Sequence, residues 1–183
     1  MLTTQMNAVI LAGGAGRKDH FRPLAFPRPL LPLANRPLLE HQLAWLAEGG
    51  VQHAVVAVDH RGASLASPSL AGIDVRLSYA PVPMGADSGL LRAACGSADR
   101  LLVVDGSLLT DVDIPGLVAA HRRSGAAITV AAPQGGPGSA CLLVAERSAL
   151  DAIRAGRPDP VGGDVHLVVD PVACAGGRFP RRH

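Results

Sequence analysis

A glycine-rich segment that ends in basic residues is the first part of this sequence that could do chemistry. It reads Leu11-Ala12-Gly13-Gly14-Ala15-Gly16-Arg17-Lys18 and follows the apolar run 7–11. Glycines let the backbone turn sharply and bring amide N–H groups close to an anion, and the two cationic side chains would neutralise its charge. The spacing matches neither the P-loop nor the GxGxxG pattern. The segment therefore predicts a phosphate-binding turn, with an ordinary glycine-rich turn after a strand as the alternative.

Strand-length apolar runs alternate with segments of helical periodicity along the chain. The expected strands are 7–11, 54–58, 74–79 (an edge strand), 101–104, 127–132, 140–144 and 165–169, and the expected helices are 37–48, 88–95, 114–123 and 149–155. This alternation predicts a three-layer α/β fold, in which a mostly parallel, Rossmann-like sheet carries helices on both faces. Ligands bind such sheets beyond the carboxyl ends of the strands, so the residues that follow each strand are the informative ones.

The composition limits the classes of function. The chain has 183 residues, of which 48% are apolar and 17% charged, which predicts one folded domain over 1–177 and a frayed tail over 178–183. A formal charge of +2 and an aromatic content of 3% argue against nucleic acid and membrane partners held by charge or stacking.

Cysteine usage and the N-terminal residues predict a cytoplasmic protein. Cys95, Cys141 and Cys174 lie far apart and form no CxxC pair, which suggests neither a zinc site nor a disulfide framework. The first residues contain no basic region followed by a long apolar run, so neither a signal peptide nor a membrane span is expected.

Two longer stretches resemble one known family. The first is LAGGAGRK followed by PRPLLPLANRPLLEHQLAWLAEGGV, and the second is LLVVDGSLLTDVDIPGLVAAHRRSGAAITVAA. They resemble the sugar-1-phosphate nucleotidylyltransferases, or NDP-sugar pyrophosphorylases, whose patterns are LAGGxGTRLxPLTxxxPKPLLPVxNKP and LNGDxLTDLDL. The match covers roughly 6–133, the expected nucleotide-binding part, and indicates a short and divergent member with the nucleotide-diphospho-sugar transferase-like fold.

The resemblance implies a reaction and its partners. An NTP would donate NMP to a sugar 1-phosphate, forming an NDP-sugar and pyrophosphate, with Mg²⁺ and basic side chains neutralising the triphosphate. It also implies which residues bind the nucleotide: Leu11, Ala12, Gly13, Gly14, Gly16, Arg17, Gly85 and Asp105. Relatives often oligomerise, so a homo- or hetero-oligomer is compatible with the resemblance.

The two catalytic cations of the family exchange identity in this chain. Counting without gaps from Gly16, the family's arginine (position 16 + 2) falls on Lys18 and its lysine (position 16 + 12) falls on Arg28. Both charges and their spacing survive, but a planar guanidinium and a compact ammonium bind phosphate with different geometry. An alternative alignment places Phe21-Arg22-Pro23-Leu24 on the family's LRPL and needs compensating gaps.

The metal site of the family is altered as well. The family's NGD carries a carboxylate that holds Mg²⁺, and here Ser107 takes its place. A hydroxyl is a weak ligand for a hard dication. Asp105, or alternatively Asp111, could substitute; otherwise Asp105 only closes the turn after its strand. Asp111 and Asp113 match the family's TDLD and are expected to cap the helix that starts at Ile114.

Other family features are missing. Gly85-Ala86-Asp87-Ser88-Gly89 stands where the family has GTAGAL, and Asp87 adds a charge that obscures the base preference. The family's EKP lysine and late aspartate have no counterpart, so 139–177 is expected to be a reduced C-terminal part with the sugar-binding stretch deleted. His121, in a His-Arg-Arg run, is expected on a solvated helix face.

Three functions follow from this resemblance. The first is an active nucleotidylyltransferase that works with impaired motifs. The second is a non-catalytic regulatory or subunit-like relative that keeps the fold and, with it, nucleotide binding. The third is a cofactor-type enzyme like molybdopterin guanylyltransferase, although its LAGGxSxRMGxxK pattern fits poorly because Arg28 falls too late.

Overall fold

The computed structural model describes residues 6–12, 28–58, 72–79, 94, 96–131, 142–154 and 165–168. Lys18, Gly13, Gly14, Gly16, Arg17 and Gly85 lie outside these ranges, as does most of the helix expected over 88–95. Arg28 is described in its backbone only, at the start of the short 3₁₀ helix η1 (Arg28–Leu30).

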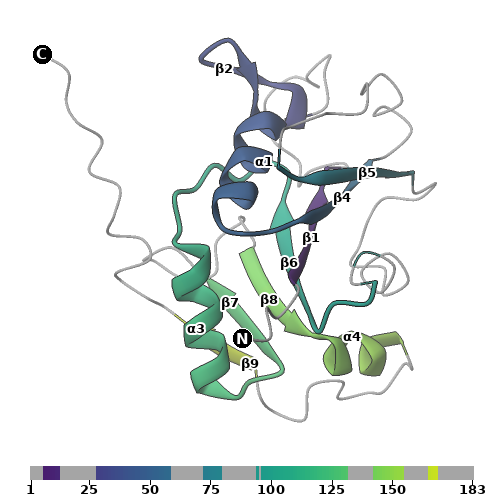
Figure 1. The fold of residues 1–183 in the computed structure, drawn as a ribbon, viewed down its shortest axis with the longest axis vertical. Helices are drawn as coiled ribbons and strands as arrows, with labels where there is room; N and C mark the ends of the chain where they lie inside the picture. The colour runs from purple at the N-terminus through teal and green to yellow at the C-terminus, as the bar shows by residue number, and fades with distance from the viewer. Residues whose placement is uncertain are drawn as a thin grey trace, which may run out of the picture.

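A seven-stranded sheet forms the centre of the described structure (Figure 1). Its strands are β1 (Met6–Leu11), β4 (His53–Val58), β5 (Asp74–Tyr79), β6 (Arg100–Asp105), β7 (Ile128–Ala131), β8 (Leu142–Glu146) and β9 (Val165–Val168). Their order is β5-β4-β1-β6-β8-β7-β9, and β8 alone among them runs antiparallel to its neighbours. The predicted mostly parallel sheet and the edge position of β5 are therefore confirmed.

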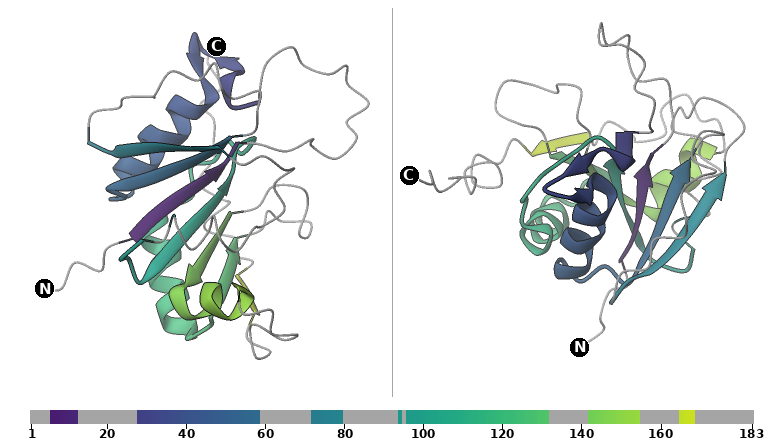
Figure 2. Two further views of the ribbon diagram at one scale, coloured as in Figure 1. Left: turned by 90° about the vertical axis from the view of Figure 1, so that its right-hand side faces the viewer. Right: turned by 90° about the horizontal axis from the view of Figure 1, so that it is seen from above.

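Helices cover both faces of this sheet, as expected from the sequence. Alternate strand residues point to opposite faces, so Ala8 and Ile10 pack with α1 (Leu38–Glu48) and α3 (Ile114–Ser124). Val9 packs on the other face with Leu150 of α4 (Arg147–Arg154). Figure 2 shows α1 and α3 on one side of the sheet and α4 on the other.

A small hairpin precedes α1, in a segment where the sequence predicted no strand. It consists of β2 (Pro32–Leu33) and β3 (Arg36–Pro37), joined by Ala34 and Asn35. Both linking residues have positive φ, 48° and 63°, which is the backbone that a tight two-residue hairpin requires. Three prolines nearby hid this hairpin, because proline usually marks a loop.

The prediction that His121 lies on a solvated face is wrong. Ile114, Leu117 and His121 form the buried side of α3, at helical spacings of i, i+3 and i+7. The His121 ring lies 2.7 Å from Thr129 Oγ1 through Nδ1 and 3.1 Å from Glu146 Oε1 through Nε2. Arg100 Nε donates to the same Glu146 oxygen at 2.6 Å. The ring therefore belongs to a polar network between α3 and the sheet.

This network predicts a loss of stability in acid. Burial lowers the pKa of His121 below its ordinary value of 6.5, although Glu146 opposes the shift. The folded state therefore binds the proton less well than the unfolded state. The contribution to the free energy of unfolding is complete above pH 6.5 and is lost as the pH falls below it, with a slope of at most about 1.4 kcal/mol per pH unit.

Urea unfolding at pH 7.5 and at pH 5.5 measures this effect. His121→Gln is expected to show a smaller pH dependence than the parent, whereas Gln52→Ala, which changes an exposed residue that does not titrate, should keep the parental one. Equal pH dependence in the parent and in His121→Gln would contradict the assignment.

Candidate functional site

The carboxyl ends of β1 and β6 meet at the place where the glycine-rich segment begins. Leu11 pairs with Asp105 in the parallel register of the two strands. The Gly106 N–H donates to the Leu11 carbonyl at 3.0 Å, and the Ala12 N–H donates to the Ala57 carbonyl at 2.8 Å. The start of the segment is thus fixed between the ends of β4 and β6. Leu11, Ala12 and Asp105, three of the predicted nucleotide-binding residues, lie together here.

Gly106 permits this close approach because it has no side chain. A Cβ atom at this position would lie 2.7 Å from the Leu11 carbonyl oxygen and 2.9 Å from Ala12 Cα. Both of these are backbone atoms, which cannot move aside without shifting β1. The glycine of the Asp-Gly-Ser triplet is therefore required by contact between two backbones, rather than by an unusual dihedral angle.

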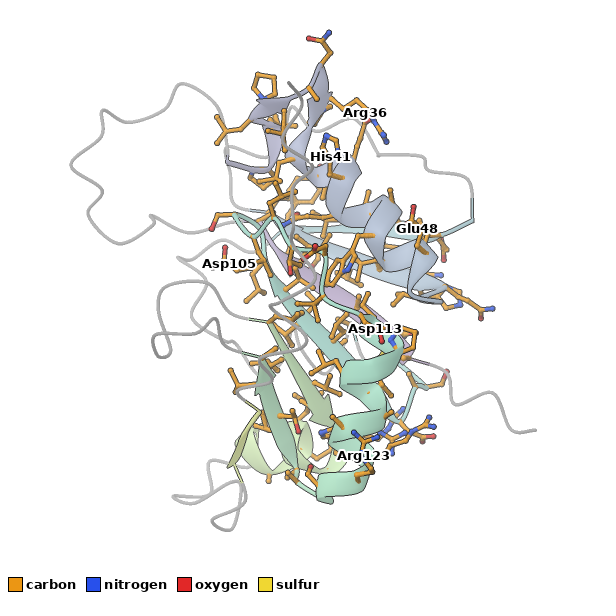
Figure 3. The ribbon with its side chains drawn as sticks, turned by 90° about the vertical axis from the view of Figure 1, so that its left-hand side faces the viewer. Arg36, His41, Glu48, Asp105, Asp113 and Arg123 are labelled. Carbon is orange, nitrogen blue, oxygen red and sulfur yellow. The ribbon has the colours of Figure 1, made fainter. Side chains whose placement is uncertain are left out.

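Asp105 closes the turn that follows β6. Its Oδ1 atom accepts hydrogen bonds from the Ser107 N–H at 2.7 Å and from the Ser107 hydroxyl at 2.5 Å. Its carbonyl accepts the Leu108 N–H at 3.0 Å. The turn-closing role considered from the sequence is therefore present, and both Ser107 hydrogen bonds go to one carboxylate oxygen. Figure 3 labels Asp105 at the end of β6 and Asp113 at the start of α3.

The backbone amides of this turn are already used. Gly106 N–H is bound to Leu11, Ser107 N–H to the Asp105 side chain and Leu108 N–H to the Asp105 carbonyl. The turn therefore cannot offer these three groups to a phosphate. It offers the second carboxylate oxygen of Asp105, which suits a cation. Any anion bound at this edge needs its donors from another segment.

Two side chains of α1 hold the segment between β6 and α3. Gln42 Nε2 donates to the carbonyls of Asp105 at 3.0 Å and Leu108 at 2.7 Å. Trp45 Nε1 donates to the Val112 carbonyl at 2.9 Å. Sequence reasoning missed Gln42, although a polar residue at a buried helix position could have drawn attention to it.

The aspartates before α3 play a smaller part than expected. Asp113 occupies the N-cap position of α3, as predicted, but its side chain makes no capping hydrogen bond. Its Oδ2 atom instead lies over Gly116, only 2.4 Å from where a Cβ atom of that residue would be. Asp111 is exposed.

A metal ion would find few protein ligands here. Within the ranges that the structure describes, no three His, Cys, Asp or Glu residues gather in a way that could hold a metal. Mg²⁺ in nucleotide enzymes is often held by one or two carboxylates together with substrate phosphates and water. The Asp105 carboxylate fits that shared arrangement, whereas these residues do not fit a metal caged by protein alone.

Comparison with known proteins identifies the family. Residues 8–167 match the MobA-like NTP transferase domain, and the chain belongs to this family. It is 29% identical over 135 residues to the mannose-1-phosphate guanylyltransferase of Mycobacterium tuberculosis, covering 71% of this chain and 38% of that protein. The chain therefore spans well under half the length of this relative. The resemblance to sugar-1-phosphate nucleotidylyltransferases is confirmed.

Solved structures share the fold. A putative glucose-1-phosphate thymidylyltransferase from Bacillus anthracis, solved with sucrose, has a TM-score of 0.68 at 15% identity and covers 88% of this chain and 85% of that one. Rv0371C from Mycobacterium tuberculosis, solved with manganese, has a TM-score of 0.57 at 17% identity and covers 90% and 88%. These likenesses confirm the predicted nucleotide-diphospho-sugar transferase-like fold. In the described part of the chain, no helix is long and apolar enough to cross a membrane.

The contact at Gly106 gives a prediction with a matched control. Gly106→Ala is expected to reduce the free energy of unfolding by about 1–3 kcal/mol, because the methyl group would push β1 and β6 apart. Gly116→Ala should be neutral or stabilising by up to about 1 kcal/mol, because the methyl group meets only the end of the Asp113 side chain and alanine favours a helix. Denaturant unfolding of both variants checks this. Equal effects in the two would contradict the contact argument.

Proposed function

We propose that this chain is a nucleotidylyltransferase domain that transfers NMP from an NTP to a sugar 1-phosphate and releases pyrophosphate. The observation that carries the proposal is the junction of β1 and β6, where the start of the glycine-rich segment lies against the Asp105–Ser107 turn. The mannose-1-phosphate guanylyltransferases among its relatives make GTP and mannose 1-phosphate the first substrates to test.

The transfer reaction indicates which residues should bind the triphosphate. An oxygen of the sugar 1-phosphate attacks the α-phosphorus of the NTP, a P–O bond forms, and the bond to pyrophosphate breaks. Catalysis then depends on holding the two phosphates together and neutralising their charge. The residues proposed to cradle and neutralise the triphosphate are Gly13, Gly14, Gly16, Arg17, Lys18 and Arg28, with Gly85 near the base.

Asp105 is the residue proposed to hold Mg²⁺, through the carboxylate oxygen that Ser107 does not use. When bound, the ion would neutralise charge on the triphosphate. A carboxylate next to a polyanion is repulsive without such a cation, and this supports a metal shared between Asp105 and the phosphates. The manganese complex of Rv0371C is consistent with a divalent ion in this fold.

A non-catalytic relative is the second candidate. It is favoured by Ser107 at the position of the family's metal-binding aspartate, and by the two hydrogen bonds that already occupy one oxygen of Asp105. Such a protein would keep the fold and bind nucleotide without transferring it. A cofactor-type acceptor, as in molybdopterin guanylyltransferase, is the third candidate and is favoured by the MobA-like family match. All three candidates would bind nucleoside triphosphates, which are made in the cytoplasm, so we also propose a cytoplasmic location.

The first test measures pyrophosphate release with GTP and mannose 1-phosphate, together with panels of other NTPs and sugar phosphates. We expect that pyrophosphate release requires a divalent cation. The Asp105 carboxylate is itself negative, so a cation has to balance its charge and that of the phosphates. Calorimetry with each NTP, with and without Mg²⁺, runs in parallel. Nucleotide binding without pyrophosphate release would favour the non-catalytic or the cofactor-type candidate, and the absence of any nucleotide binding would exclude all three.

The second test separates the two roles of Asp105. Asp105→Asn keeps an oxygen that accepts the Ser107 hydrogen bonds but removes the charge, so the turn should stay closed while transfer falls about a hundredfold. Ser107→Asp restores the family's carboxylate and should raise the rate about tenfold or more. Rates as a function of Mg²⁺ concentration measure both effects. Full activity in Asp105→Asn would limit Asp105 to closing the turn.

A further inference from the structure

Gln42 is a polar side chain at a buried position of α1. It is 3% exposed and shares its face of the helix with Leu39, Leu43 and Leu46. Burying an amide costs free energy unless hydrogen bonds replace those to water. Gln42 Nε2 provides two, to the carbonyls of Asp105 and Leu108. Both amide hydrogens are thus committed to the turn that follows β6.

These two carbonyls belong to the first and the fourth residues of the turn. Asp105 and Leu108 are also joined by their own backbone hydrogen bond of 3.0 Å. Gln42 therefore ties both ends of the turn to the helix, and Ser107 lies between the tied ends. Trp45, one helical turn further along α1, holds Val112 in the same connection. The helix fixes the connection at two points, and the Gln42 point is next to the proposed Mg²⁺ ligand.

The amide oxygen of Gln42 shows that a gain in stability alone does not explain why a glutamine occupies this position. Only the NH₂ group can donate to carbonyls, so the two hydrogen bonds fix the orientation of the amide. Its Oε1 atom is then buried without a hydrogen-bond partner among the described residues. An unpaired buried acceptor is unfavourable, and an apolar side chain of similar size would avoid it. The glutamine thus places the turn at some expense of stability.

We propose that Gln42 is a positioning residue, which holds the Asp105–Leu108 turn so that the Asp105 carboxylate and the Ser107 hydroxyl face the bound nucleotide. The effect of this placement on nucleotide transfer rests on the proposed function. The placement of the turn rests only on the Gln42 hydrogen bonds, so the two parts can be tested separately.

The placement is tested by amide hydrogen exchange in Gln42→Met, which keeps the length of the side chain but removes both donors. Gln52→Met is the matched control, because Gln52 is exposed just beyond α1. We expect exchange at Ser107 and Leu108 to become at least about tenfold faster in Gln42→Met only. Exchange at Val104, within the β1–β6 ladder, should not change. Parental exchange at Ser107 and Leu108 in folded Gln42→Met would overturn the proposal.

The chemical consequence is tested by steady-state kinetics of the same variants. In Gln42→Met, we expect kcat/KM for the NTP to fall at least about tenfold and the Mg²⁺ concentration for half-maximal rate to rise, while KM for the sugar phosphate stays the same. A general loss of folding would not produce this split, and thermal melting checks for it. A KM for the sugar phosphate that rises as much as the KM for the NTP, with an unchanged Mg²⁺ requirement, would overturn the positioning role.

Two further outcomes keep the tests distinct. A parent protein without transfer activity would count against the proposed function, while hydrogen exchange would still decide the placement of the turn. If Gln42→Met does not fold, Gln42→Asn supports the same exchange comparison, because asparagine remains a neutral amide but is one methylene too short to reach both carbonyls. Gln52→Asn is then its control.

Discussion

The contact between Gly106 and the end of β1 is the constraint on which the candidate site depends. Two parallel strands end side by side, and the chain leaving β6 passes so close to Leu11 and Ala12 that no side chain fits between them. The Gly106 hydrogen bond to Leu11 extends the strand ladder by one more residue into the turn. Because of this contact, the glycine-rich segment and the Asp-Gly-Ser turn begin from one fixed point.

The two segments that begin here, the turn after β6 and the glycine-rich segment after β1, suit charges of opposite sign. The amides of the turn after β6 are bound to Leu11 and to Asp105, and the turn presents a carboxylate, so it suits a cation. The segment after β1 is rich in glycine and followed by arginine and lysine, so it suits an anion. A metal–nucleotide complex has both charges. This division of charge explains why one ligand would need both segments. It also gives a reason for the buried glutamine of α1, which holds the turn after β6.

Much of the fold could be predicted because hydrophobic periodicity reports burial directly. The continuous apolar runs of β1, β4 and β6 are buried on both faces, and the alternating run of β5 lies at an edge, as the two patterns predict. The hairpin before α1 was missed because it depends on positive φ at Ala34 and Asn35, which short-range composition did not reveal. His121 was misplaced because its polar neighbours in sequence hid a partner, Glu146, on a distant strand.

The site was predictable only where residue type alone decides its chemistry. Asp105 and Ser107 could be read from the altered triplet, but the hydrogen bonds between them depend on the local turn. Gln42 could not be assigned a role, because its partners lie more than sixty positions away along the chain. The cationic residues Lys18 and Arg28 and the glycines before them remain predictions, since their side-chain positions lie outside the described structure.

The most direct test of the central claim is a nuclear magnetic resonance titration of the ¹⁵N-labelled protein with GTP and Mg²⁺. If both segments bind one ligand, the amide signals of Leu11 and Ala12 should shift together with those of Asp105 to Leu108, at the same ligand concentration. The amide signals of Gln52 and Arg100, which lie at the amino ends of β4 and β6, should stay in place. Shifts confined to the amino ends of these strands, or shifts in only one of the two segments, would contradict the account.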